Sequence, residues 1–294
     1  AGGGAGQSKE AVIEKMVEDF LERLPGDFSL FDIKSRIGEN FTPYLVVLLQ
    51  ECERMNILLG TMRKSLIDLQ LGLQGALNIS DMMDQQMSAM FLDRIPGVWE
   101  KQAWRTLKTL PVWFQDVLDR YEQFNRWQEG LKMPPTVWLS GTANPMAFVT
   151  AVMQTTARAN QWPLDEVETF TDITKLDWET PEAQPEEGAY VHGLYIEGAR
   201  WDRDAGELRD SILRELAPQM PVIQLKAIRT TDRRMTGYYD CPVYYVSQRG
   251  GGNPPGSFVF FGQLRTSEKT VATLYGIYSY KWVLAGVGLL LQID

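Results

Sequence analysis

The amino-acid sequence predicts an α+β fold, in which an N-terminal α-helical bundle with one long spine helix precedes a C-terminal six-stranded β-barrel. A change of pattern supports this fold class. Before Asp165 apolar side chains recur at helical spacing, whereas beyond Asp165 they alternate with polar residues, which is typical of strands. The length of 294 residues suggests two domains, with three possible, and the change of pattern separates a helical part from a β part at about Asp165.

The spine helix is predicted from Thr42 to Leu77. Its apolar or thiol side chains follow alternating steps of three and four residues, which places them on one helical face. We call them the seam: Leu45, Leu48, Cys52, Met55, Leu59, Met62, Leu66, Leu69 and Leu73. A two-stranded coiled coil would show the same pattern. Because further amphipathic sequences flank the spine, we favour a seam that is covered within the chain.

Shorter helices are predicted on both sides of the spine, and most of them begin at a capping residue or a proline. Four tryptophans lie between Trp99 and Trp127, and we expect them to anchor packing because each buries a large area. The predicted helices are Ser8–Leu24, Phe28–Ile37, a helix from Ser80 that ends before Pro96, Pro111–Gly130 and Asn144–Asn160.

The β part is predicted from segments rich in Tyr, Val and Phe, which suit a small barrel or a sandwich. One helix, Gly206–Leu216, is expected to interrupt them. Two loops are also expected, an acidic one over Asp177–Gly188 and a glycine-rich one over Arg249–Gly256. The predicted strands are Val167–Thr174, Tyr190–Ala199, Val222–Ile228, Tyr238–Val246, Ser257–Leu264 and Lys281–Ile293.

Composition and net charge indicate a globular protein and argue against some classes of binding partner. The 294 residues are 44% hydrophobic and 23% charged, which describes a globular chain with a sizeable core. The net charge of −9 argues against binding to nucleic acid or to an acidic membrane surface. The two cysteines lie in unrelated contexts, which favours reduced thiols in a cytoplasmic compartment. We see neither a signal peptide nor an apolar run of the ~20 residues that a membrane span needs.

The sequence offers no convergent set of reactive side chains. The Gly/Ala tract Ala1–Gly6 lacks the Lys and Ser or Thr of a phosphate-binding loop, and we interpret it as a linker. His192 is the single histidine, and on a predicted strand it is expected to be structural. We therefore assign no catalytic residue, no cofactor-binding residue, no cofactor and no metal ligand.

A set of carboxylates could be imagined for acid–base chemistry, namely Glu197, Asp202 and Asp204. Pairing of Arg200 with Asp202 at a turn is the favoured interpretation of this stretch, because the two charges are opposite and only two positions apart.

Several segments, in their order along the chain, resemble the C-terminal end of axonemal dynein heavy chains. The resemblance is strongest to outer-arm, beta-type heavy chains. The resemblance covers nearly everything after about Glu10. The segments that carry it are Pro43–Val47, Gln50–Asn56, Ser65–Leu66, Leu69–Leu73, Phe91–Asp93, Thr136–Gly141, Asn144–Pro145, Ala157–Arg158, Trp162–Asp165, Gly193–Asp202 and Asp240–Tyr244. Gly250–Pro255 and Val271–Ser279 look like insertions against that pattern.

The resemblance implies a non-catalytic fragment of a larger motor. Residues 1–60 resemble the small subdomain of the sixth AAA module, and 61–165 and 166–294 resemble the helical and barrel halves of the C-terminal domain. It implies that the fragment stabilises and regulates the AAA ring of a minus-end-directed microtubule motor that drives ciliary or flagellar beating.

The implied partners are the first, fifth and sixth AAA modules of the same heavy chain, with other dynein subunits as further candidates. Microtubules would be contacted only through the distant stalk, and the implied location is the ciliary or flagellar axoneme in the cytoplasm. The alternative is a stand-alone adaptor that recognises a protein partner on its β-barrel surface.

Overall fold

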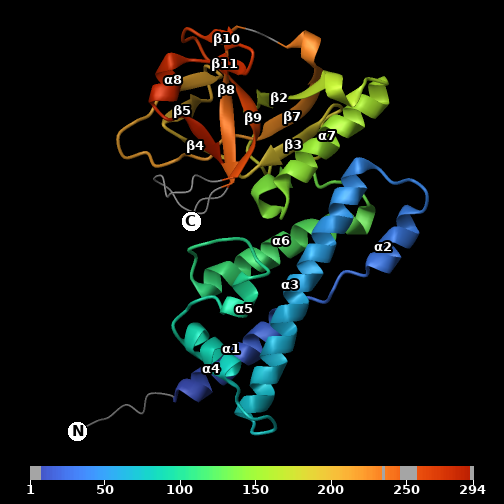
Figure 1. Ribbon diagram of the computed structural model, residues 1–294, viewed down its shortest axis with the longest axis vertical. Helices are drawn as coiled ribbons and strands as arrows, with labels where there is room; N and C mark the ends of the chain where they lie inside the picture. The colour runs from blue at the N-terminus through green and yellow to red at the C-terminus, as the bar shows by residue number, and fades with distance from the viewer. Residues whose placement is uncertain (1–7, 234–235, 246–256, 292–294) are drawn as a thin grey trace. The chain divides into compact units, whose positions relative to one another are not determined.

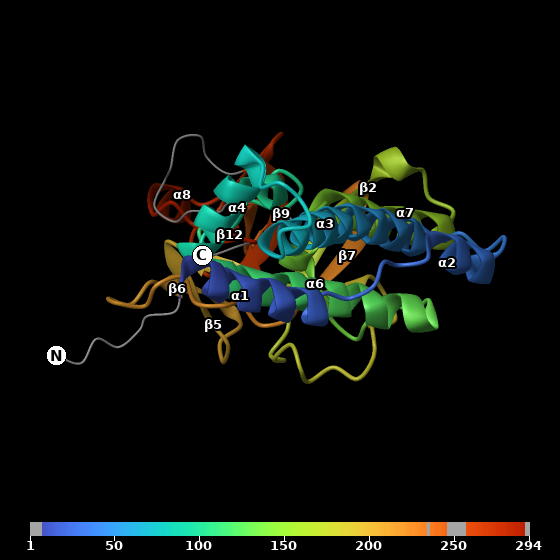
Figure 2. The same cartoon turned by 90° about the horizontal axis from the view of Figure 1, so that it is seen from below.

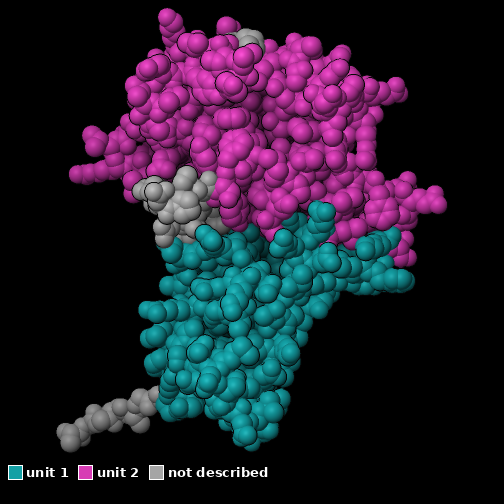
Figure 3. Space-filling model, in the orientation of Figure 1, with its two compact units in different colours: residues 1–34, 50–122 teal, residues 35–49, 123–294 magenta. Residues whose placement is uncertain are grey.

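The computed structural model describes residues 8–233, 236–245 and 257–291, so the Gly/Ala tract 1–6 and the loop 249–256 lie outside the described residues (Figure 1). The chain divides into two compact units (Figure 3). The first unit comprises 1–34 and 50–122, and the second comprises 35–49 and 123–294.

The predicted spine is a single helix, α3 (Pro43–Leu73). Thr42 precedes it, and its hydroxyl accepts the N–H of Leu45 at 3.3 Å, as the cap prediction requires. Eight of the nine seam side chains are at most 8% exposed, and Leu73 at the end is half-buried. Because this burial is achieved within one polypeptide, a second copy is not needed to cover the seam.

Aromatic packing joins the helices of the first unit. Its helices are α1 (Lys9–Arg23), α4 (Asp81–Phe91), α5 (Gly97–Glu100) and the first part of α6 (Leu110–Gly130). α1 runs beside α6 (Figure 2), and the rings of Phe20 and Phe114 stack at 4.3 Å between centroids. Trp99 lies 5.9 Å from Trp113 and donates its indole N–H to the Ser65 hydroxyl of α3 at 2.8 Å. The tryptophans therefore anchor packing, as predicted.

Asn144 and Pro145 begin the long helix of the second unit, α7 (Pro145–Asn160). The Asn144 side chain accepts the N–H of Ala147 at 3.1 Å, which confirms the predicted cap. α7 contacts β7 (Ile223–Arg229) and β2 (Val167–Ile173) of the first sheet, and its inward side chains Phe148 and Val152 are fully buried. The short helix α2 (Leu30–Ile37) has residues in both units.

Within the described residues, the strands form two four-stranded sheets and two hairpins. The first sheet has the order β1-β3-β7-β2, with β1 at Val137–Trp138 and β3 at Ala189–His192. The second has the order β4-β12-β8-β9, and the hairpins are β5-β6 and β10-β11. The bounds of these strands are Tyr195–Glu197 (β4), Gly288–Leu290 (β12), Tyr238–Tyr245 (β8), Ser257–Arg265 (β9), Ala199–Asp202 (β5), Glu207–Asp210 (β6), Val271–Thr273 (β10) and Gly276–Tyr278 (β11).

The prediction of a six-stranded β-barrel is wrong, although the α+β class holds. In the described residues no backbone ladder joins the two four-stranded sheets. Their edges β2 and β9 meet instead through side chains. Gln263 Oε1 accepts the N–H of Thr171 at 3.2 Å, and Thr171 Oγ1 accepts the N–H of Gln263 at 2.6 Å. Alternating hydrophobicity identified the strands but carried no information about which edges pair.

Two further expectations fail in the β part. The predicted helix Gly206–Leu216 is instead the strand β6 followed by irregular structure, in which Ile212 and Leu216 are exposed. The predicted strand Lys281–Ile293 is instead the short helix α8 (Tyr280–Leu284) followed by β12. Gly286, with φ of +67°, allows the backbone to turn between them.

Trp138 fits between two glycines. A Cβ added at Gly141 or at Gly193 would collide with the Trp138 ring. Gly193 also has φ of +86°, a left-handed conformation that favours glycine, and it separates β3 from β4 in what the sequence suggested was one strand.

Replacing Leu59 by Asp is expected to destabilise the first unit by about 4 kcal/mol, because Leu59 is fully buried and a carboxylate at this site loses its hydration. Ile57→Asp is the matched control, since Ile57 lies on the same helix but is 51% exposed, and it should cost about 0.5 kcal/mol. Urea denaturation followed by circular dichroism measures both. Equal midpoints for the two variants would show that the seam is not buried.

Replacing Gly193 by Ala is expected to destabilise the second unit by about 3 kcal/mol, through backbone strain together with the clash against Trp138. Gly206→Ala is the control for strain alone, because Gly206 has φ of +68° and no atom within 4 Å of an added Cβ. Its expected cost is about 1 kcal/mol. Thermal denaturation compares the variants, and a smaller loss for Gly193→Ala than for Gly206→Ala would contradict the packing of Trp138.

Candidate functional site

His192 lies on β3 and stacks on Trp178, with 5.1 Å between ring centroids. Burial lowers its pKa to about 4, so the imidazole is neutral at pH 7. Within the described ranges, no hydrogen bond joins its ring to a hydroxyl or carboxylate. Its surroundings are those of a packed aromatic residue.

The three candidate carboxylates for acid–base chemistry do not converge. Asp202 ends β5, and its Oδ1 accepts the N–H groups of Asp204 and Ala205 at 3.0 Å each, which organises the β5-β6 turn. These bonds, that from Ala205 above all, lower the pKa of Asp202. The Nε of Arg209 lies 3.9 Å from Asp202 Oδ2, and the charge of Arg200, the favoured partner, also lowers the pKa of Asp202.

Both thiols are buried and belong to different units, with Cys52 on α3 and Cys241 on β8. Burial raises the pKa of Cys52 to about 12 and raises that of Cys241 further. Thiols in this state are chemically inert at neutral pH.

A buried polar network surrounds Asp240 on β8, and sequence reasoning missed it. The Asp240 carboxylate is 1% exposed, forms an ion pair with Arg233, and accepts the N–H of Ile277 at 2.7 Å and the Gln263 amide at 3.3 Å. Arg233 also pairs with Glu168 at 3.2 Å, and burial raises the pKa of Glu168. The network fastens the β10-β11 hairpin to β8. The sequence signal that could have indicated this network is Asp240 itself, a charged residue between the buried strand residues Tyr239 and Cys241.

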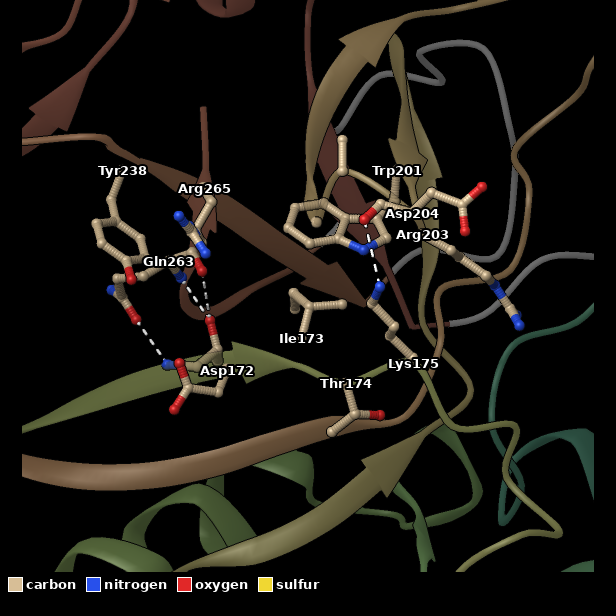
Figure 4. A pocket seen from close by; sticks show the side chains of 13 residues that line it. Asp172, Ile173, Thr174, Lys175, Trp201, Arg203, Asp204, Tyr238, Gln263 and Arg265 are labelled. Carbon is tan, nitrogen blue, oxygen red and sulfur yellow. Dashed lines mark hydrogen bonds between the residues drawn. The ribbon is translucent and has the colours of Figure 1, made fainter. Parts of the chain in front are cut away.

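A cleft of about 440 Å³ opens in the second unit where β2, the β5-β6 turn, β8 and β9 approach one another (Figure 4). Trp201 and Ile173 form its apolar centre, with Arg265 to one side and Lys175 and Arg203 to the other. The remaining lining residues are Thr171, Asp172, Thr174, Asp204, Ala205, Gly206, Tyr238 and Gln263.

Most charges of the cleft are already engaged. Asp172 pairs with Lys226 at 2.6 Å, outside the lining, and Arg203 pairs with Asp177 at 2.8 Å. Lys175 donates to the Asp204 carbonyl at 3.3 Å. Among the described residues of the lining, no nucleophile is hydrogen-bonded to a base.

The described residues hold neither a metal-ligand cluster nor a membrane-spanning helix. Within 8–233, 236–245 and 257–291, no three His, Cys, Asp or Glu side chains are grouped as metal ligands would be. None of the helices in this part of the protein has the length and apolar character that crossing a bilayer requires.

Several of the segments that carry the resemblance meet in the second unit. Val137 and Trp138 pair in parallel with Val191 and His192, immediately before Gly193. Leu289 of β12 pairs with Ile196 on one side and Val243 on the other. Segments far apart in sequence therefore form one packed structure.

The pKa of His192 predicts a loss of stability in acid. A folded-state value of about 4 lies below the ordinary 6.5, so the stabilisation is complete above pH 6.5 and is lost as the pH falls toward 4. The upper bound on this loss is about 3 kcal/mol. Urea denaturation between pH 7 and 4 should show that His192→Phe, which keeps the ring stacking, loses less stability than the native protein. Parallel pH profiles would refute the assignment.

Residues 1–291 match the family model of the C-terminal domain of dynein heavy chains. The sequence is 43% identical over 285 residues to "Dynein beta chain, ciliary" of Tripneustes gratilla and 41% identical over 290 residues to "Dynein axonemal heavy chain 9" of Homo sapiens. It is 43% identical over 292 residues to "Dynein alpha chain, flagellar outer arm" of Chlamydomonas reinhardtii.

These alignments cover 97%, 99% and 97% of this chain, respectively. The chain spans about 6% of the length of each relative. A match this long at this identity establishes the family, and the chain belongs to the family of C-terminal domains of dynein heavy chains.

Proposed function

We propose that this chain is the C-terminal region of an outer-arm, beta-type axonemal dynein heavy chain. The observation that carries this proposal is the family match over 1–291, together with relatives that are named as ciliary, axonemal or flagellar dyneins. In this role the chain works in the ciliary or flagellar axoneme as part of a minus-end-directed microtubule motor that drives beating.

Within the motor, the chain stabilises and regulates the AAA ring and hydrolyses nothing itself. Support comes from the second unit, whose residues are engaged in packing: His192 stacks on Trp178, and Asp240 fastens a hairpin. ATP hydrolysis and microtubule binding belong to other parts of the heavy chain. The partners are the first, fifth and sixth AAA modules of the same polypeptide, and other dynein subunits are further candidates.

The three parts of the chain keep distinct roles in this proposal. Residues 1–60 contribute the small subdomain of the sixth AAA module. Residues 61–165 form the helical half of the C-terminal domain and 166–294 its β half. In support, α3 (Pro43–Leu73) runs across the first of these limits as one continuous helix. The compact units divide the chain elsewhere, because 1–34 and 50–122 belong to one and 35–49 and 123–294 to the other.

The purified chain is expected to show neither ATP turnover nor micromolar affinity for ATP in isothermal titration calorimetry. Cross-linking of the intact heavy chain should then connect this region with the first, fifth and sixth AAA modules. Micromolar ATP binding by the chain alone would defeat the non-catalytic role. Cross-links confined to other modules would defeat the assignment of partners.

A further inference from the structure

The cleft begins where the edges of the two sheets separate. Thr171 on β2 and Gln263 on β9 are tied by side-chain hydrogen bonds, including one from Thr171 Oγ1 to the Gln263 carbonyl at 3.0 Å. Two residues further along each strand, Ile173 and Arg265 both line the cavity (Figure 4). The cavity is therefore a gap between the edges of β2 and β9. It begins next to the hydrogen bonds between Thr171 and Gln263.

The backbone of Ile173 faces this gap. In an antiparallel ladder, successive residues direct their N–H and C=O groups alternately toward and away from the partner strand. Thr174 donates its N–H to Val222, beside β7, at 3.0 Å, so its neighbour Ile173 points the opposite way. The N–H of Thr171, which shares this orientation, is bound by Gln263 rather than by β7.

The backbone of Arg265 faces the gap from the other side. Thr266 donates its N–H to Gly237, beside β8, at 3.0 Å, so Arg265 directs its own N–H and C=O away from β8. Gln263 has the same orientation, and its N–H reaches Thr171 across the gap. Each edge thus presents backbone donors and acceptors of the kind that an added strand pairs with.

Side chains give this slot a chemical preference. The Trp201 ring and Ile173 offer an apolar surface in the middle of the cleft, and Arg265 and Lys175 stand on either side of it (Figure 4). Arg265 is exposed and has no ion pair in the described residues. The lining also holds the carboxylates of Asp204 and of Asp172, which pairs with Lys226. Three cations against two carboxylates leave an excess of positive charge, which favours an acidic ligand.

We propose that the cleft binds an extended peptide segment of a partner protein by strand addition between β2 and β9. The segment pairs with the backbone of Ile173 and Arg265, lays an apolar side chain on Trp201 and directs acidic side chains toward Arg265 and Lys175. Binding of this kind requires only the cleft and is independent of any contact with the AAA ring.

The protein's own acidic loop over 177–188 does not supply this segment. Trp178 O accepts the Thr136 hydroxyl at 2.9 Å, and Gln184 Oε1 accepts the N–H of Tyr190 at 2.8 Å. Glu187 O accepts the Gln224 amide at 2.8 Å. These bonds hold the loop against its neighbours, so this loop is not the free segment that the cleft binds.

The test uses the full chain and a fluorescein-labelled probe peptide, Glu-Val-Tyr-Val-Glu, in fluorescence anisotropy. One control peptide carries Lys in place of both Glu residues, and a second has its alternate backbone nitrogens methylated, which removes the N–H donors. The variants are Arg265→Glu and Lys175→Glu, both at exposed positions. Arg54→Glu, an exposed residue of α3 in the first unit, is the matched control.

We expect saturable binding of the acidic peptide and a shift of the Ile173 amide resonance in NMR spectra. Arg265→Glu and Lys175→Glu should each weaken binding about tenfold, whereas Arg54→Glu should not. Absence of binding up to about 1 mM peptide overturns the proposal. If the Lys peptide binds as tightly as the acidic peptide, the cleft has no charge preference and the proposal is wrong. If the methylated peptide binds as tightly as the acidic peptide, the segment does not pair as a strand, and the proposal is also wrong.

Discussion

The second unit depends on the burial of one short strand between two others. β12 is fully buried, pairs antiparallel with β4 and parallel with β8, and supplies the connection between them. The Tyr239 hydroxyl donates to the carbonyl of Val287 just before it at 3.1 Å, and Trp282 of α8 donates to Thr266 at 2.9 Å. Three residues thus hold a sheet together because their backbone groups are satisfied on both sides and their side chains are excluded from water.

The first unit is stabilised differently, by aromatic rings and the helical seam. The helix α3 belongs to both units, because it contributes 43–49 to the second unit and 50–73 to the first. The helix α6 is also divided between the two units. A helix that crosses such a limit needs apolar residues along its whole length, because each unit buries its own portion. This accounts for a seam of nine side chains, more than one packing layer of an ordinary helix requires.

Local signals predicted the helices well and the β part only partly. The seam, the Asn144 cap and the tryptophan cluster follow from spacing and residue type alone. The helix expected at Gly206–Leu216 failed because Asp202 binds two backbone N–H groups and starts a hairpin, an effect that helical periodicity does not register. The missing barrel closure and the cleft depend on Thr171 and Gln263, which are 92 positions apart, so neither could be found by a local pattern.

The burial of both native cysteines has a practical consequence for studying motion. Because Cys52 and Cys241 are shielded from reagents, a single cysteine engineered at an exposed position of either unit would react alone with a maleimide dye. Two such positions, one on each unit, would form a donor–acceptor pair for energy transfer without first removing native thiols. The unaltered chain is therefore a suitable background for recording distances between its two units.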